Sequence, residues 1–258
     1  MTTAQQPAAI VLIHGAGDTS HVWTRTQGYL HHPSIAVDLL GRASRPFDIT
    51  QVTLEAAADA AADDVRRAAH GPFVVVAHSA GGMVAPAVVR RLGRDTAHLV
   101  LIAGVVAPHG VAAVDVLHPA RRDAFAQHRA TLLPEHAGHM YARGPAADAG
   151  RVDGLTVLSD PLVARAIDSL NLMFQPVSWE GVPAALPRTW VRPLGDALQT
   201  VDMQDRLIAA CAATEVVPLD ADHTPARSNP QMLARVLDEI ATRYDDVSAS
   251  RGRDERDR

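Results

Sequence analysis

The stretch FVVVAHSAGG, residues 73–82, decides the fold, because four large apolar residues lead directly into a run of small and polar ones. The apolar run is typical of a buried strand, and the stretch Ala80–Leu92 that follows is typical of a helix. A sharp turn between a strand and a helix lifts a serine above the sheet, and the first N–H groups of the helix point toward the same place. The pattern therefore predicts Ser79 as a nucleophile.

Short β-branched runs recur on both sides of this stretch and alternate with helical patterns. Strands that alternate with helices form parallel sheets with helices on both faces. The predicted strands are Ile10–Ile13, Ile35–Asp38, Phe73–Ala77, Leu99–Ala103, Thr189–Arg192 and Glu215–Leu219. The predicted helices are Leu54–Ala69, Ala80–Leu92, Met203–Ala213 and Pro230–Tyr244. The fold class is therefore α/β, with a mostly parallel sheet.

The alternation is interrupted between residues 107 and 181, a segment rich in His, Ala, Pro and Arg that has helical pieces but no clear buried strand. This pattern predicts a helical cap inserted into an α/β core, which residues 1–106 and 182–245 form. Residues 246–258 are charged and have no apolar face, so we expect a disordered tail there.

The composition excludes several classes of function. The 258 residues carry a formal charge of −5, so they supply no basic surface for nucleic acid. All 24 basic residues are arginine, which excludes Schiff-base chemistry and the phosphate-binding lysine of a P-loop. The single cysteine, Cys211, lies in an apolar helical stretch and is expected to be buried. Its isolation, with no signal or membrane-spanning segment in view, predicts a cytoplasmic protein.

The turn around Ser79 resembles the nucleophile elbow of the α/β-hydrolase fold, G-x-S-x-G, with Ala77 in place of the first glycine. A second likeness follows the first strand, where the stretch HGAG at 14–17 is similar to the family's His-Gly loop. The resemblance implies that the backbone N–H groups of Ala16 and Ala80 form an oxyanion hole. It also implies that His14 holds the loop rather than moving protons.

The resemblance further implies a catalytic triad in the chain order Ser, acid, His. Asp196 follows a predicted strand in a turn with Gly195, where the family carries its acid, and His223 follows the last strand, where the family carries its base. The histidine takes the serine proton, and the acid fixes its tautomer and stabilises its charge. Asp222, the neighbour of His223, is expected to be a loop residue.

Within this superfamily, the chain is most similar to the cofactor-free hydroxynitrile lyases and plant methylesterases. The likeness includes the stretch HVW at 21–23, the elbow and the acid turn GDAL at 195–198. The lyases carry a lysine directly after the catalytic histidine, where this chain has Thr224. The resemblance thus implies a serine hydrolase that cleaves an ester, lactone or thioester of a small, largely apolar substrate. A lyase on the same triad and a ligand-sensing receptor with this fold remain alternatives.

Three further expectations concern ligands. The substrate is expected to be a small molecule, bound by a monomer or homodimer without a cofactor. The candidate pocket residues are the large apolar side chains Trp23, Met140, Phe174 and Trp179.

The sequence disfavours two rival sites, one for a dinucleotide and one for a metal. The stretch GAGDTS at 15–20, with Asp38 about 20 residues further on, is nearly a dinucleotide fingerprint but lacks its third glycine. The histidines of the predicted cap do not form a ligand set of known spacing, so no metal is expected. These histidines are His109, His118, His128, His136 and His139.

Overall fold

The computed structural model describes residues 7–42, 44–48, 51–117, 119–123 and 171–245, together with the short segments 139–140, 150–152, 155–157 and 168–169. Its centre is one sheet of six parallel strands, in the spatial order β10-β9-β4-β3-β1-β2. The strands are β1 (Ala9–Ile13), β2 (Ser34–Val37), β3 (Phe73–His78), β4 (Thr96–Ile102), β9 (Arg188–Pro193) and β10 (Glu215–Leu219). All six predicted strands are confirmed.

The strand order determines where a ligand can bind. The chain runs from β1 outward to β2, then returns to the other side of β1 with β3 and continues to β4, β9 and β10. The order therefore reverses between β1 and β3, and open α/β sheets bind ligands beyond the carboxyl ends of the strands at such a point. The loop that follows β1 and the turn that follows β3 meet there.

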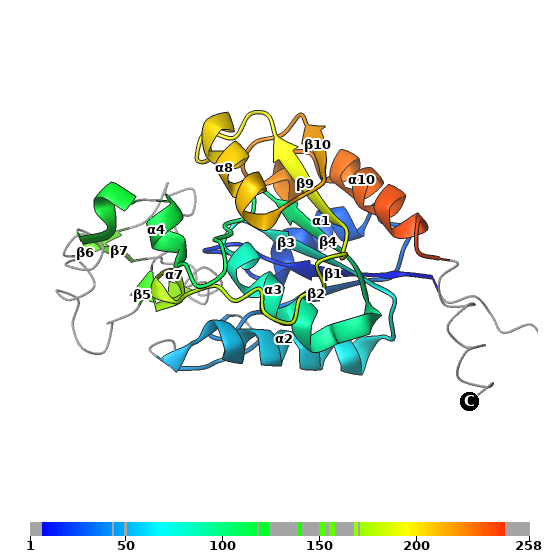
Figure 1. Ribbon diagram of the computed structural model, residues 1–258, viewed down its shortest axis with the longest axis horizontal. Coiled ribbons are helices and arrows are strands. Elements are labelled where there is room, and N and C mark those ends of the chain that lie inside the picture. Colours follow the sequence, from blue (N-terminus) through cyan, green and yellow to red (C-terminus); the bar gives the residue numbers. More distant parts are fainter. Residues whose placement is uncertain are drawn as a thin grey trace, which may run out of the picture.

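Helices cover both faces of the sheet, because alternate residues of the central strands are buried on opposite faces (Figure 1). On one face lie α2 (Leu54–Ala68), α3 (Gly81–Leu92) and α8 (Val201–Cys211). On the other lie the short η1 (Ser20–Trp23), α1 (Thr24–Gln27), α9 (Pro225–Ser228) and α10 (Pro230–Thr242). The prediction of an α/β fold with helices on both faces is confirmed.

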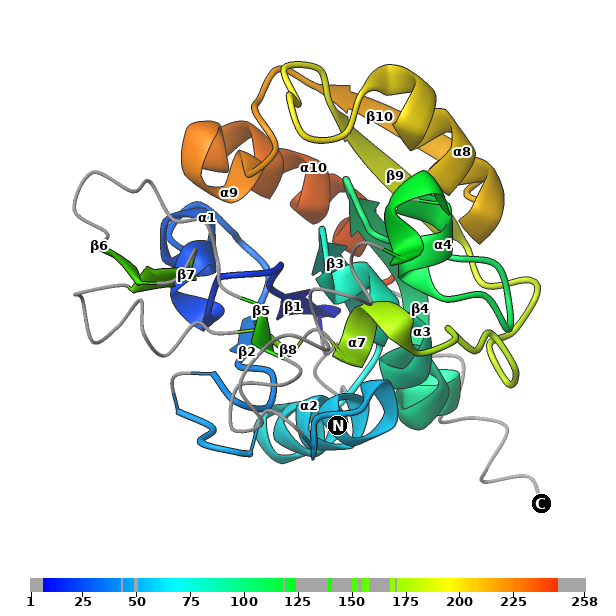
Figure 2. The ribbon, with the colours of Figure 1, turned by 90° about the vertical axis from the view of Figure 1, so that its left-hand side faces the viewer.

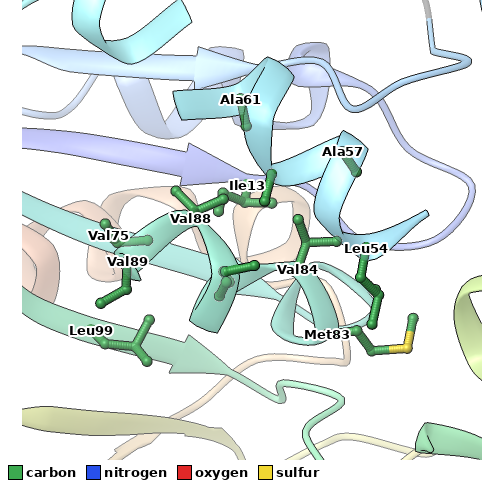
Figure 3. Packing of buried hydrophobic residues seen from close by; sticks show 14 of the residues in the cluster. Ile13, Leu54, Ala57, Ala61, Val75, Met83, Val84, Val88, Val89 and Leu99 are labelled. Atoms are coloured by element: carbon green, nitrogen blue, oxygen red, sulfur yellow. The ribbon is translucent and has the colours of Figure 1, made fainter. Parts of the chain in front are cut away.

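The packing of α2 and α3 fixes the turn that precedes α3. Helix α2 begins at an N-cap, Thr53, whose hydroxyl accepts a 3.0 Å hydrogen bond from the Ala56 amide. Its buried residues recur at helical spacing and face α3, whose valines Val84 and Val88 lie in the same cluster as Ile13 of β1 (Figure 3). This apolar layer holds the N-terminal end of α3 against the sheet.

The predicted cap is described only in part. Its described elements are α4 (Ala113–Leu117), the 3-10 turn η4 (Pro119–Arg121), α7 (Asn171–Phe174) and two small antiparallel pairs, β5 (His139–Met140) with β8 (Asp168–Ser169) and β6 (Gly150–Val152) with β7 (Leu155–Val157). Helices α4 and α7 contact each other and lie on the side of the sheet where the strands end (Figure 2). The predicted tail, residues 246–258, lies outside the described residues.

Candidate active site

Ser79 lies in the turn between β3 and α3, in a backbone conformation that residues other than glycine rarely adopt. Its φ is 46°, in the left-handed region. Three backbone hydrogen bonds hold it there: its amide donates to the Ile102 carbonyl at 3.0 Å, and its own carbonyl accepts from Val105 and Gly82 at 2.7 and 2.9 Å. Such a conformation costs roughly 1–3 kcal/mol and persists only where the surroundings impose it. The strain is a mark of a functional turn.

Glycines allow three segments of backbone to meet at this turn. A Cβ at Gly81 would lie 2.6 Å from the His14 carbonyl oxygen, and one at Gly82 would lie 2.8 Å from the Val105 carbonyl oxygen. Neither position has room for a side chain. The small residues after Ser79 are therefore required by close packing of α3 against the loops that follow β1 and β4.

The structure brings the three predicted triad residues together from the ends of three strands. The Nε2 atom of His223 lies 3.0 Å from the Ser79 hydroxyl oxygen, and its Nδ1 atom lies 2.7 Å from Asp196 Oδ2. These contacts join residues 144 and 27 positions apart in the chain. The imidazole therefore spans the hydroxyl and the carboxylate, as nucleophile activation requires.

Asp196 is held as a carboxylate. Its side chain is 1% exposed, and its Oδ1 accepts hydrogen bonds of 2.8 Å from the backbone amides of both Leu198 and Gln199. Burial acts to raise its pKa, but the hydrogen bonds from His223 and these amides outweigh burial and hold the pKa below its usual value. An ionised Asp196 accepts a hydrogen bond from the Nδ1–H group of His223, which leaves Nε2 unprotonated and able to accept from the Ser79 hydroxyl.

The loop that carries His223 is fastened to the acid turn and folded on itself. The Gly195 amide donates to the Ala221 carbonyl at 2.9 Å. Asp222 accepts hydrogen bonds of 2.8 Å from the Thr224 amide and the Ser228 hydroxyl. Asp222 thus has the loop role predicted for it, and Asp196 is the carboxylate that contacts the imidazole.

Ala80 directly follows Ser79 as the N-cap residue of α3, and Ala16 follows Gly15, where an added Cβ would lie 3.0 Å from Ser79 Cβ. Neither amide donates to another group within the described part of the chain. His14 holds the Ala16 loop: it is fully buried, donates from Nδ1 to the Gly15 carbonyl at 2.9 Å and accepts from the Leu39 amide at 3.2 Å. Burial and then the charge of Arg42 lower its pKa to about 3, so it stays neutral.

The four pocket candidates lie in different places. Trp23 is 1% exposed and stands edge-on to His78, with ring centroids 6.4 Å apart. Phe174 packs on the small cluster between α4 and α7. Trp179 donates from its indole nitrogen to the Ala107 carbonyl at 2.8 Å and lies beneath the Arg188 guanidinium. The side chain of Met140 lies outside the described residues.

The structure describes only some of the residues that the two rival sites would use. The Asp38 carboxylate, which a dinucleotide site would need for a ribose, accepts from the Ser20 amide at 2.7 Å and the Ser44 hydroxyl at 2.7 Å. It thereby holds loops near the site. Of the cap histidines, His118, His128 and His136 lie outside the described residues, and within the described ones no three metal-ligating side chains gather.

Three further groups at this site were not predicted from the sequence: His78, Gln199 and the ion pair of Asp18 with Arg227. His78 donates to the His223 backbone, and Gln199 donates from its side chain to the Ala103 carbonyl at 2.9 Å while its amide binds Asp196. Asp18, in the loop after β1, also forms an ion pair with Arg227 of α9. The contacts of His78 with His223, of the Gln199 side chain with Ala103 and of Asp18 with Arg227 join distant parts of the chain, so no local pattern reveals them. The one available signal is that His78 is a polar residue at the buried end of an apolar strand.

Comparisons with known proteins identify the family of the chain. The chain is 28% identical over 256 residues to the lipase LipV of Mycobacterium tuberculosis, an alignment covering 90% of this chain and 92% of that protein. Its fold matches an extracellular alpha/beta-hydrolase from a Paenibacillus species that shares structural and functional homology with tobacco salicylic acid binding protein 2, with a TM-score of 0.73, 18% identity and coverage of 90% and 98% of the two chains. It also matches a pyrethroid hydrolase from Sphingobium faniae, with a TM-score of 0.69, 20% identity and coverage of 91% and 97%. The sequence profile of the alpha/beta hydrolase family matches residues 10–236, and the chain belongs to that family.

Proposed function

We propose that this chain is a serine esterase that cleaves an ester, lactone or thioester of a small, largely apolar substrate. One observation carries the proposal: a single imidazole, His223, contacts the Ser79 hydroxyl at 3.0 Å and the Asp196 carboxylate at 2.7 Å. The related proteins support it, because they include a lipase, a pyrethroid hydrolase, a methylesterase and polyneuridine aldehyde esterase.

In the first half of the proposed reaction, Ser79 Oγ attacks the carbonyl carbon of the substrate while its proton passes to His223 Nε2. The carbonyl electron pair moves onto oxygen, where the Ala16 and Ala80 amides stabilise the negative charge. Asp196 stabilises the imidazolium that forms. The tetrahedral intermediate then collapses, the bond to the leaving group breaks, and His223 donates its proton to the departing alcohol or thiol.

The second half repeats these steps with water. His223 takes a proton from a water molecule as that water attacks the acyl carbon on Ser79. Collapse of the second tetrahedral intermediate breaks the bond to Oγ, the proton returns to Ser79, and the acid leaves. Both halves need His223 neutral at Nε2, because that nitrogen must accept the proton of Ser79 and then that of water.

The proposed reaction uses no metal and no cofactor. Within the described residues, no helix has both the length and the apolar character needed to span a membrane. A cytoplasmic location and a monomeric or homodimeric state stay predictions that rest on composition.

Stopped-flow hydrolysis of p-nitrophenyl acetate tests the proposal. We expect a burst of nitrophenol equal to the enzyme concentration, followed by steady turnover, because the acyl-enzyme forms and then hydrolyses. Ser79→Ala should lose both phases, and Ser178→Ala should keep both, since the Ser178 hydroxyl serves only to accept a hydrogen bond from the Glu180 amide in the described structure. A burst without turnover would indicate a sensor, and the absence of both burst and turnover would refute the esterase proposal.

A panel of esters would then narrow the substrate class. Aromatic methyl esters, pyrethroid esters, lactones and short triglycerides represent the chemistries at issue. A hydrolysis rate on one class at least tenfold above the rate on p-nitrophenyl acetate would identify the preferred substrate class.

A further inference from the structure

His78 makes a contact that the proposed mechanism does not use. It is the last residue of β3 and stands directly before Ser79, with 3% of its surface exposed. Its Nε2 atom lies 2.7 Å from the carbonyl oxygen of His223, a residue 145 positions away. The residue before the nucleophile is thus bonded to the backbone of the base.

We infer that His78 is a positioning residue, whose Nε2–H group holds the His223 backbone where the imidazole faces Ser79. The inference rests on the proposed function and adds to it a group that sets the alignment of the triad. Because His78 and Ser79 are consecutive, one short segment of backbone positions both the nucleophile and the loop that carries the base.

The chemistry of the contact determines the tautomer of His78. A carbonyl oxygen only accepts hydrogen bonds, so the proton must be on Nε2. Burial, and then the charge of His223, lower the pKa of His78 to about 4, so at neutral pH the ring carries one proton only. Its Nδ1 atom is buried and has no hydrogen-bond partner in the described residues.

The ring has little freedom to move away from this contact. On one side, a Cβ added to Gly15 would lie 2.9 Å from Nδ1, so the His-Gly loop packs directly on the ring. On another, Trp23 stands edge-on, with the two ring planes at 89°. The rings of His78 and His223 lie 5.1 Å apart. Packing therefore holds the His78 ring in the position from which it donates to the His223 carbonyl.

Apart from the contact between His223 Nε2 and the Ser79 hydroxyl, the other hydrogen bonds of the loop that carries His223 do not connect it to the elbow. The Gly195 amide ties Ala221 to the acid turn, and Asp222 bonds within its own loop to Thr224 and Ser228. The bond from His78 joins the loop to β3. Without it, we expect the imidazole to remain paired with Asp196 but to lose its alignment with the Ser79 hydroxyl.

A pair of nearly isosteric variants tests this inference. In His78→Gln the amide still donates from a similar position, whereas His78→Met fills the space without a donor. The readout is the rate at which a fluorophosphonate probe modifies the protein, followed by intact mass. We expect His78→Met to react about 100-fold more slowly than wild type, as a misplaced catalytic group would, and His78→Gln to recover most of that loss.

His98 supplies the matched control. It is also buried, and burial also lowers its pKa to about 4, but it lies near the amino end of β4 and contacts Tyr244 and Thr189. His98→Met should lose comparable stability and keep the wild-type labelling rate. Equal rates in His78→Met and wild type would overturn the inference, and so would a loss that His78→Gln does not recover. An unlabelled wild type would instead refute the proposed function.

Nuclear magnetic resonance gives two readouts besides reactivity. A long-range proton–nitrogen spectrum of the wild type must show His78 protonated at Nε2; protonation at Nδ1 would overturn the inference even if no variant folds. The low-field proton of the Asp196–His223 hydrogen bond should shift or broaden in His78→Met and return in His78→Gln. A resonance unchanged in both variants would show a merely structural role.

Discussion

Two buried histidines at opposite edges of the sheet show how one fold separates stability from chemistry. At the amino edge, His98 is bonded at both ring nitrogens: Nδ1 accepts from the Tyr244 hydroxyl and Nε2 donates to Thr189, each at 2.8 Å. Thr189 in turn donates to Glu215 at 2.6 Å, and Glu215 pairs with Arg243. Every member of this network has a partner, so it fastens the end of α10 to the sheet.

The carboxyl edge is built in the opposite way. Ser79 is strained, His78 has a buried ring nitrogen without a partner, and the Oε1 atom of Gln199 is likewise buried and without a partner in the described residues. Proteins usually satisfy buried polar groups and avoid strain, and exceptions gather at functional sites. The carboxyl edge, which has the less favourable local structure, is thus the one that carries the proposed reaction.

The largest expected effect comes from removing the nucleophile. Ser79→Ala should lower turnover of p-nitrophenyl acetate by on the order of 10⁴- to 10⁶-fold, as loss of a triad member does. The denaturation midpoint should stay close to that of wild type, because the methyl group occupies the same strained position. Residual turnover above a tenth of wild type would show that the carboxyl edge is not the site.

The acid of the triad comes next. Asp196→Asn should lower turnover by about 10⁴-fold, because the amide favours the wrong tautomer of His223. Asp222→Asn is the matched control, since Asp222 contacts only Thr224 and Ser228 among the described residues, and its rate should stay close to wild type. The reverse ranking would make Asp222 the catalytic acid.

At the amino edge, the expected effect is on stability in acid. Because burial lowers the folded-state pKa of His98 from 6.5 to about 4, the folded protein binds fewer protons than the unfolded chain between these pH values. The contribution of neutral His98 to the free energy of unfolding is complete above pH 6.5 and is lost as the pH falls toward 4. Urea unfolding from pH 7 to 4 should show an acid-dependent loss that is about 3 kcal/mol smaller in His98→Gln. Parallel curves would show that His98 does not titrate in this way.

The smallest effect concerns backbone strain. Ser79→Gly should be roughly 1 kcal/mol more stable than Ser79→Ala, because glycine adopts a φ of 46° without the clash of a Cβ. Ala212, an exposed left-handed residue at the end of α8, provides the comparison, and Ala212→Gly should stabilise by a similar or smaller amount with full activity. Chemical denaturation measures both; a destabilised Ser79→Gly would argue against strain at the elbow.

Much of this molecule could be predicted from its sequence because the decisive signals are local. The apolar runs predicted all six strands of the sheet, and Cys211 is buried as expected, with its pKa raised to about 11 by burial. The elbow pattern around Ser79 and the chain order of Asp196 and His223 located the three residues that meet in space.

What could not be predicted depends on contacts between distant residues. The bond from His78 to His223 joins segments that no spacing rule connects. A tryptophan looks the same in sequence whether it faces a substrate or packs on other side chains, so the contacts of Trp23 with His78 and of Trp179 with Arg188 could not be predicted. The segment 107–181 has no sustained periodicity, which is why its small antiparallel pairs could not be predicted from it.

The central claim is that Ser79 is activated by His223, and one measurement tests it without knowledge of the substrate. Wild-type protein, Ser79→Ala and His223→Ala would be treated with a fluorophosphonate, and the adduct located by peptide mass spectrometry. We expect a single adduct on Ser79 in wild type and none in either variant. An adduct on another serine, or labelling of Ser79 at the wild-type rate in His223→Ala, would contradict it.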